Sequence, residues 1–162
     1  MILSKPPPES EQTGLLQKSL SQLGWSLIQN ALAAQTFSPV TASLCRALSP
    51  EPDWDATGQL LAETSEMVSL QESGDPFPIS AYEDVRILIA DAREKQYLEA
   101  GRCLQILKFL RLCRALQRAL AKKHDAPLLQ SLGARLDPPL PFLKELEQCI
   151  SDDGEIREDA TP

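Results

Sequence analysis

Proline is distributed unevenly along this chain, and its placement constrains the fold more than any other sequence feature. Most of the 13 prolines fall into groups at residues 6–8, 50–52, 76–78 and 138–141. A proline inside a helix removes a backbone hydrogen bond and clashes with the preceding turn, so these groups should separate elements rather than lie within them. The pattern predicts a series of elements joined by proline-containing connections.

The segments between the prolines have the composition of helices. Leu, Ala, Gln, Glu, Lys and Arg dominate, only 7 glycines are present, and β-branched residues are scattered. Aromatic residues make up 5% of the chain, so a core must be built mainly from aliphatic side chains. The 43% of hydrophobic and 24% of charged residues are ordinary for a soluble protein. We therefore predict an all-α fold of about six or seven helices in a single domain over residues 15–162.

The N-terminal region divides into a polar part and an apolar part. Residues 1–14 are polar and proline-rich, and we predict a disordered leader because they carry too few apolar side chains to offset the entropy of ordering. From Leu15 to Leu32 apolar residues recur at helical spacing, with a break expected near Gly24. Trp25 follows this glycine and is expected to anchor the element in the core.

Two polar residues mark helix starts further along the chain. In the pair Ser38-Pro39 the hydroxyl can cap free backbone amides and the proline suits the first helical position. Asp53 is a second candidate cap, followed by an apolar stripe that runs to about Glu72. These caps predict two helices, one that ends by Pro50 and one that begins after Asp53.

The second half of the chain contains the strongest helical pattern. Residues 98–123 are predicted to form a central helix, because one continuous apolar face is made by Ile106, Leu107, Leu110, Cys113, Leu116, Ala119 and Leu120. A helix that starts near Ala81 or Tyr82 should precede it, and shorter helices are predicted at 128–136 and 142–150. The Asp-Gly turn at residues 153–154 could lead into a short strand.

No pattern in the chain indicates catalysis, and we predict no catalytic, cofactor-binding or metal-binding residue. A Gly-x-x-x-x-Gly-Lys-Ser/Thr phosphate loop is missing from the sequence. The single histidine, His124, follows two lysines at an expected helix end, where interaction with the helix dipole is the preferred interpretation over a role as a general base. The acidic pair Asp152-Asp153 falls in a predicted turn, where acidic residues are common.

The cysteines and the N-terminal residues bear on location. Widely separated thiols without a Cys-x-x-Cys pair indicate reduced, mostly buried residues at Cys45, Cys103, Cys113 and Cys149. The first residues run into prolines rather than into a long apolar stretch, so neither a signal peptide nor a membrane span is predicted. We expect a cytoplasmic protein without a membrane partner.

Basic residues along one side of the predicted central helix form the main electrostatic feature. At about 100° per residue they occupy about a third of the helix circumference, and we call them the basic stripe: Lys108, Arg111, Arg114, Arg118 and Lys122. Nucleic acid is one anionic neighbour that could offset their mutual repulsion. The preferred interpretation is that the stripe is solvated or faces acids of the same domain, such as Glu63 and Glu66 or Glu145 and Glu147. The net charge of −7 also argues against a chain that mainly coats phosphates.

Several short strings, in the same order, resemble the N-terminal region of bacterial MutS-like proteins of the type-two branch. The resemblance runs from about residue 17 to the C-terminus, and none of its strings is a catalytic signature. The strings are Leu20-x-x-Leu23-Gly24-Trp25, Phe37-Ser38-Pro39, Leu60-x-x-x-Thr64-Ser65-Glu66-Met67, the loop to Ile79, Asp84-Val85 and Ile150-Ser151-Asp152-Asp153-Gly154-Glu155-Ile156.

The resemblance implies how a complete member would be built. It would continue through a lever helix, a clamp, a dimerising ATPase and often a C-terminal Smr nuclease domain, so this chain would be a fragment that ends before the lever. ATP and Mg²⁺ would be bound only by the ATPase domain, and the homodimer would form through domains outside this chain. DNA or the ribosome would be the partner of the parent protein, in suppression of recombination or in ribosome rescue. Mismatch recognition is not implied, because the branch lacks the mismatch-reading domain.

These observations together predict a non-catalytic scaffold that supports the DNA- or ribosome-clamping arms of a dimeric ATPase. Its core should include Trp25, Leu107, Leu110 and Leu116, and Trp25→Ala should cost about 3–5 kcal/mol if the ring is fully buried. Two alternatives remain open. One is a nucleic-acid-binding helical module that uses the basic stripe, and the other is an unrelated helical bundle that binds a partner helix.

Overall fold

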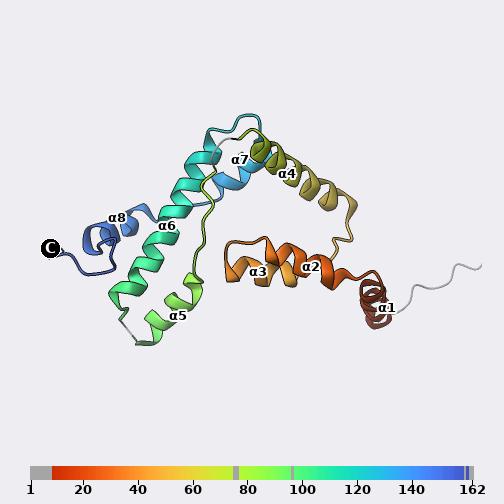
Figure 1. Cartoon of the computed structure of the whole chain (residues 1–162), viewed down its shortest axis with the longest axis horizontal. Helices are drawn as coiled ribbons and strands as arrows, with labels where there is room; N and C mark the ends of the chain where they lie inside the picture. The colour runs from red at the N-terminus through yellow and green to blue at the C-terminus, as the bar shows by residue number, and fades with distance from the viewer. Residues whose placement is uncertain (1–8, 75–76, 96, 159, 161–162) are drawn as a thin grey trace, which may run out of the picture. The chain divides into compact units, whose positions relative to one another are not determined.

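The computed structural model describes residues 9–74, 77–95, 97–158 and 160, with side chains from residue 14 onwards. Within this part of the chain there are eight α-helices (Figure 1), so the predicted all-α fold is confirmed. The helices group into two compact units, Met1–Ser49 with α1 to α3 and Pro50–Pro162 with α4 to α8. The single domain predicted for residues 15–162 stays a prediction.

The first unit contains α1 (Glu9–Gln22), α2 (Trp25–Ala34) and α3 (Pro39–Arg46). The break expected near Gly24 is confirmed, since this glycine has a φ of 68°, a left-handed conformation that costs glycine little. The leader predicted for residues 1–14 stays a prediction for residues 1–8, which lie outside the described part, whereas α1 begins at Glu9. Glu and Gln are good helix formers, so a polar composition did not exclude a helix here.

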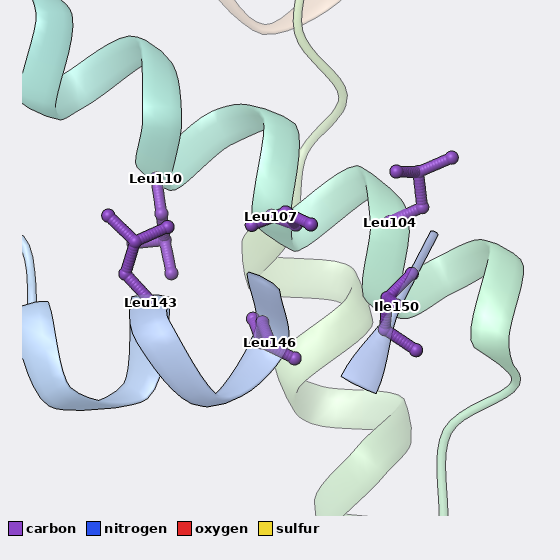
Figure 2. Packing of buried hydrophobic residues seen from close by; sticks show 6 residues of the cluster. All are labelled: Leu104, Leu107, Leu110, Leu143, Leu146 and Ile150. Atoms are coloured by element: carbon purple, nitrogen blue, oxygen red, sulfur yellow. The ribbon is translucent and has the colours of Figure 1, made fainter. Parts of the chain in front are cut away.

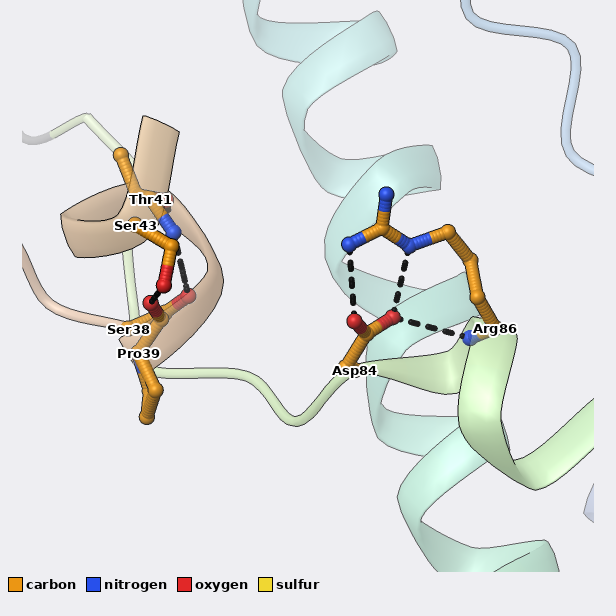
Figure 3. Close-up of polar contacts among 6 residues, drawn as sticks. All are labelled: Ser38, Pro39, Thr41, Ser43, Asp84 and Arg86. Atoms are coloured by element: carbon orange, nitrogen blue, oxygen red, sulfur yellow. Dashed lines mark hydrogen bonds and ion pairs between the residues drawn. The ribbon is translucent and has the colours of Figure 1, made fainter. Parts of the chain in front are cut away.

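The start of α3 is capped as the sequence predicts (Figure 3). The backbone N–H of Thr41 donates to Ser38 Oγ at 3.4 Å, and Pro39 occupies the first turn. Ser43 Oγ donates to the Pro39 carbonyl at 3.0 Å. Ser38 is only 4% exposed, so its oxygen serves a helix end that water reaches poorly.

Trp25 lies at the start of α2 and is half-buried, which corrects the expectation that it anchors a core. Its Nε1 donates to the Leu48 carbonyl at 3.0 Å, and Gln29 Nε2 donates to the same oxygen at 2.8 Å. Indole is amphipathic, so a ring that uses its N–H near the surface need not be enclosed. Among the described side chains of the first unit, only Ala33 and Ser38 are buried.

The second unit contains α4 (Trp54–Glu72), α5 (Val85–Lys95), α6 (Ala100–Ala121), α7 (Pro127–Ala134) and α8 (Leu140–Cys149). Asp53 caps α4 as predicted, because its Oδ1 accepts the backbone N–H of Ala56 at 2.8 Å. The predicted central helix is confirmed as α6, which packs against α5, α7 and α8.

The start predicted for α5 near Ala81 or Tyr82 is wrong, since residues 77–84 have no regular secondary structure and the helix begins at Val85. Asp84 provides the physical reason. Its Oδ1 accepts the backbone N–H of Arg86 at 3.1 Å, in the manner of a helix cap, and its carboxylate also binds the Arg86 guanidinium (Figure 3). The Asp84 side chain therefore caps the first turn of α5.

The larger hydrophobic cluster lies between α6 and α8 (Figure 2). Leu104, Leu107 and Leu110 of α6 meet Leu143, Leu146 and Ile150, with Leu107 and Leu143 at 0% exposure. The core positions predicted at Leu107 and Leu110 are confirmed, whereas Leu116 is only half-buried. The periodic face of α6 is therefore enclosed mainly in its N-terminal half, where α8 covers it.

The smaller hydrophobic cluster joins α4, α6 and α7 through Leu70, Leu120, Ala126 and Leu129. A Cβ added at Gly133 would lie 2.7 Å from Leu120 Cβ, so glycine permits the close approach of α7 to α6. Glu66 of α4 accepts the backbone N–H groups of Leu128 and Leu129, at 3.1 and 2.8 Å. This carboxylate satisfies free amides at the N-terminus of α7, where the helix dipole favours negative charge.

The chain turns back on itself after α8. Ile150 and Ile156 form an isolated antiparallel bridge around a turn in which Gly154 has a φ of 83°. Arg157 N donates to the Cys149 carbonyl at 2.9 Å, and Ser151 N donates to the Glu155 carbonyl at 2.9 Å. The predicted Asp-Gly turn is confirmed, and the short strand considered after it is reduced to this one bridge.

Candidate nucleic-acid interface on α6

The structure places four residues of the basic stripe on α6 and the fifth, Lys122, at its C-terminal cap. Lys108, Arg118 and Lys122 are exposed, whereas Arg111 and Arg114 are half-buried. α8 packs against α6 at Leu104, Leu107 and Leu110, and its Glu147 binds Arg111 of the stripe.

Arg111 is neutralised by acids of the same unit. Its Nε donates to Glu147 Oε1 at 3.1 Å, and its Nη1 donates to Asp152 Oδ1 at 2.8 Å. The hydrogen bond that Arg111 donates to Asp152 raises the pKa of the Arg111 guanidinium, and the same bond lowers the pKa of the Asp152 carboxyl below its usual range. The intramolecular interpretation is thus confirmed at Arg111, through one of the acids named for it.

The other acids proposed to face the stripe have different partners. Glu66 caps α7, and Glu63 accepts the side-chain amide of Gln59 at 3.0 Å within α4. No ion pair joins Glu145 to the stripe within the described residues. The sequence alone could not identify Glu147 as the acid that pairs with Arg111, because this pairing depends on how α8 lies against α6.

Lys108 stands at the junction of two surface grooves. One has a volume of about 440 Å³ and lies between the segment 78–81 and the α6 residues Lys108, Arg111, Leu112 and Ala115. The other has a volume of about 250 Å³ and is lined by residues that include Tyr82, Gln105 and Phe109. The rings of Tyr82 and Phe109 pack against each other, with their centroids 5.5 Å apart. The ammonium group of Lys108 also contributes to the lowered pKa of Asp152, after the larger effects of Arg111 and Arg157.

Arg114, Arg118 and Lys122 differ from Arg111 in that no ion pair involves them in the part of the chain that the structure describes. They are spaced four residues apart, so each lies about 6 Å further along the helix axis than the last. Like charges at this spacing destabilise an isolated helix. Among the described residues, three cations of the stripe are therefore left without an internal counter-charge.

The comparisons with known proteins bear on the whole chain rather than on the stripe. No family model matches it. It is 27% identical over 146 residues to endonuclease MutS2 of Symbiobacterium thermophilum, which is 90% of this chain and 18% of that protein. Endonuclease MutS2 of Synechocystis sp. is 26% identical over 95% of the chain, and that of Anaeromyxobacter sp. is 28% identical over 91%. The chain is therefore similar to part of these MutS2 proteins.

This result confirms the resemblance predicted from the short strings. The MutS2-like chain spans about a fifth of the length of the curated relatives it matches, namely 18% or 19% in these three. Activities named for the relatives therefore belong to proteins about five times as long. They cannot be assigned to residues of this chain by similarity.

The remaining candidate chemistry of the MutS2-like chain is sparse. His124 lies in the turn that follows α6. The four cysteines are free and half-buried, and burial raises the pKa of the Cys103 and Cys113 thiols, which makes them less reactive. Within the described residues, no group of three or more His, Cys, Asp or Glu side chains could hold a metal ion, and no helix is long and apolar enough to cross a membrane.

Sequence reasoning named Glu147 among the candidate partners of the stripe but missed Asp152 and the pair between Arg102 and Asp91. The ion pair between Arg102 and Asp91 joins α6 to α5, and the bond from Arg111 to Asp152 joins α6 to the C-terminal turn. The sequence pattern marks Asp152 only as a turn residue. Its position two residues before Gly154, which has a φ of 83°, is a usable signal, because a fixed turn holds its acidic side chains in a defined direction.

Proposed function

We propose that this chain is the structural, non-catalytic scaffold region of a MutS2-like protein. The observation that carries the proposal is the similarity to MutS2 proteins over about nine-tenths of the chain, 90% and 95% for two relatives. A region that accounts for a fifth of a large protein and consists of packed helices serves to position other parts. The chemistry of the relatives would then reside elsewhere in their length.

The packing of the second unit supports this role. The helix α6 has 22 residues and is therefore about 33 Å long at about 1.5 Å per residue, enough to act as a rigid spine. Its N-terminal half is fixed by α8 and its C-terminal half by α7, which is also held to α4 through Glu66. A load applied at one end of α6 would be transmitted through packed side chains rather than through a flexible loop.

We propose that ATP and Mg²⁺ are bound outside this chain. The sequence lacks a phosphate loop, and the described side chains lack a metal-binding cluster. We therefore place ATP binding, ATP hydrolysis and strand cleavage in regions of a MutS2-like protein other than the one matched by this chain. Homodimer formation is placed in those regions too.

The wider role proposed for the parent protein follows from the family. The relatives are named endonucleases, and a MutS2-like parent would act on DNA in the control of recombination, or on the ribosome in its rescue. In either case this chain would support the parts that hold the partner. The similarity disfavours the alternative of an unrelated partner-binding bundle.

Two measurements test the scaffold proposal. The purified chain should unfold cooperatively with a helical circular dichroism spectrum, and it should neither hydrolyse ATP nor cleave DNA above the level of a mock preparation. ATP turnover or strand cleavage by these residues alone would overturn it. Sequencing the coding region downstream of Pro162 in the genome provides the second test, since an open reading frame with a phosphate loop is expected there.

A further inference from the structure

The distribution of counter-charges divides the basic stripe into two parts. Arg111 is bound by Glu147 and Asp152, and Lys108 lies close enough to Asp152 to affect its pKa. Arg114, Arg118 and Lys122 form no ion pair with the described residues. We name these three residues the open stripe, and we propose that the open stripe binds the phosphodiester backbone of a nucleic acid.

The spacing of the open stripe suits a row of phosphates. From residue 114 to residue 122 the helix rises by eight steps, or about 12 Å along its axis at about 1.5 Å per residue. One strand of a duplex advances about 3.4 Å along its axis per phosphate, so the open stripe covers about three or four phosphates. Two of its three members are arginines, whose planar guanidinium groups can bind phosphate oxygens in pairs.

Binding to the open stripe would relieve repulsion that the fold leaves in place. Positive side chains four residues apart on one helix weaken that helix, and here three follow in succession. At Arg111 this repulsion is offset by the acids Glu147 and Asp152. Further along α6, no ion pair among the described residues offsets it. A polyanion laid along the C-terminal half of α6 is the ligand that would neutralise all three residues at once.

The same residues indicate that the backbone, rather than the bases, is bound. Recognition of unpaired bases uses aromatic platforms beside the charges. The rings near α6 are half-buried and engaged in packing: Tyr82 and Phe109 pack against each other beside Lys108, and Phe77 packs against the cluster that contains Leu120. Duplex DNA and double-stranded RNA therefore share the chemistry that the open stripe can recognise, namely regularly spaced phosphates.

The proposal goes beyond the scaffold function, and neither depends on the other. A scaffold without an open stripe would still support the rest of a MutS2-like protein. Loss of nucleic-acid binding would therefore leave the scaffold proposal standing, and ATP turnover by the chain would overturn the scaffold without affecting the stripe.

The test uses the full chain and fluorescence anisotropy with a DNA duplex of about 20 base pairs and a matching RNA duplex at several salt concentrations. Three phosphate contacts predict a slope of log affinity against log salt of about −2.7, which is roughly a 40-fold loss between about 50 and 200 mM salt. Arg114→Gln, Arg118→Gln and Lys122→Gln should each reduce the slope by about 0.9, and the triple variant should abolish binding.

Two controls separate this site from general charge. The matched triple variant Arg93→Gln, Lys95→Gln and Lys144→Gln removes the same charge from exposed residues of α5 and α8 and should retain the slope. Arg111→Gln should also retain it, because its guanidinium is already paired. Unchanged circular dichroism spectra and unfolding midpoints would show that each variant is folded.

Each outcome either supports or overturns phosphate binding by the open stripe. A slope lost only in the open-stripe variants supports the proposal, and a difference between the DNA and RNA arms would identify the natural backbone. No binding at about 25 mM salt, where the electrostatic attraction is strongest, would overturn it, and so would equal loss in the matched triple variant. Displacement of the duplex by an equal charge concentration of polyglutamate would also overturn it, since the surface would then suit an acidic protein.

Discussion

The two units of this chain solve the problem of holding helices together in different ways. The second unit encloses leucines between helices, with Leu107 and Leu143 at 0% exposure. In the first unit, only one alanine and one serine are buried among the described side chains, whereas Leu23 and Leu27 are 77% and 74% exposed. Its defined contacts are instead polar, from Trp25 and Gln29 to the Leu48 carbonyl and from Ser38 to α3.

The difference shows how the length of a helical unit limits the number of residues that it can bury. The first unit ends at residue 49, and a chain of that size buries a small fraction of its surface, so few positions are fully removed from water. Hydrogen bonds and caps then determine a larger share of its geometry. The second unit is more than twice as long and can surround α6 from several sides. Stability is therefore expected to be distributed unevenly, with the second unit unfolding last.

The largest effect should come from the core of the second unit. Leu107→Ala should lower the free energy of unfolding by about 2–5 kcal/mol, because it leaves a cavity among fully enclosed side chains. The same change at Leu27, 74% exposed in the first unit, should cost less than about 0.5 kcal/mol. Urea denaturation measures both, and equal losses would show that the two units are alike after all.

The next effect concerns the close approach of α7 to α6. Gly133→Ala should cost about 1–3 kcal/mol, because the new Cβ would lie 2.7 Å from Leu120 Cβ. Gly58→Ala is the matched control in α4, where nothing lies within 4 Å, and it should be neutral or stabilise by up to about 1 kcal/mol. If thermal unfolding shows no difference between the two variants, Leu120 must be able to move without cost.

The helix caps allow a direct comparison between the units. Ser38→Ala and Asp53→Ala should each cost about 0.5–2 kcal/mol, because each removes an acceptor for a free amide of a first turn. The loss at buried Ser38 should be the greater, and Ser38→Thr should recover part of it. Amide hydrogen exchange should become faster in α3 for Ser38→Ala and in α4 for Asp53→Ala. Ser26→Ala, at an exposed position of α2, is the control that should change neither.

A smaller effect is expected from the indole of the first unit. Trp25→Phe keeps a ring but removes the Nε1 donor, and it should cost about 0.5–1.5 kcal/mol, since Gln29 still donates to the Leu48 carbonyl. Trp54→Phe, where the side chain is 88% exposed, should leave stability unchanged. Chemical denaturation compares them. A loss of several kcal/mol at Trp25 would mean that the ring is part of an enclosed core.

The smallest effect is a shift in a titration. The Arg111 guanidinium lowers the pKa of Asp152, so this carboxylate stabilises the fold at pH values above its unfolded pKa of about 3.9, and the contribution is lost as pH falls through the lower folded pKa. Arg111→Gln should raise the pKa of Asp152 towards its ordinary value, as followed by NMR of the carboxyl carbons. The pKa of Asp84, which Arg86 lowers by a separate hydrogen bond, should stay where it is.

Local structure was largely predictable because its causes lie within a few residues. Gly24, the pair Ser38-Pro39 and Asp53 mark helix boundaries that the structure contains, since a left-handed glycine and a capping oxygen act on adjacent backbone amides. The central helix followed from apolar periodicity alone. The start of α5 was placed too early because the sequence analysis did not identify Asp84 as a cap, whose Oδ1 accepts the backbone N–H of Arg86.

By itself, the sequence determined the helical class, most helix boundaries, the likeness to MutS-like proteins and the existence of a row of basic residues on one side of α6. Only the tertiary structure decided which of those cations are neutralised. Glu147 and Asp152 lie 36 and 41 residues from Arg111 in sequence, and their distance in space depends on how α8 packs. It also decided that Trp25 is half-buried while Leu107 is enclosed, because burial depends on which helix covers a face and not on the face itself.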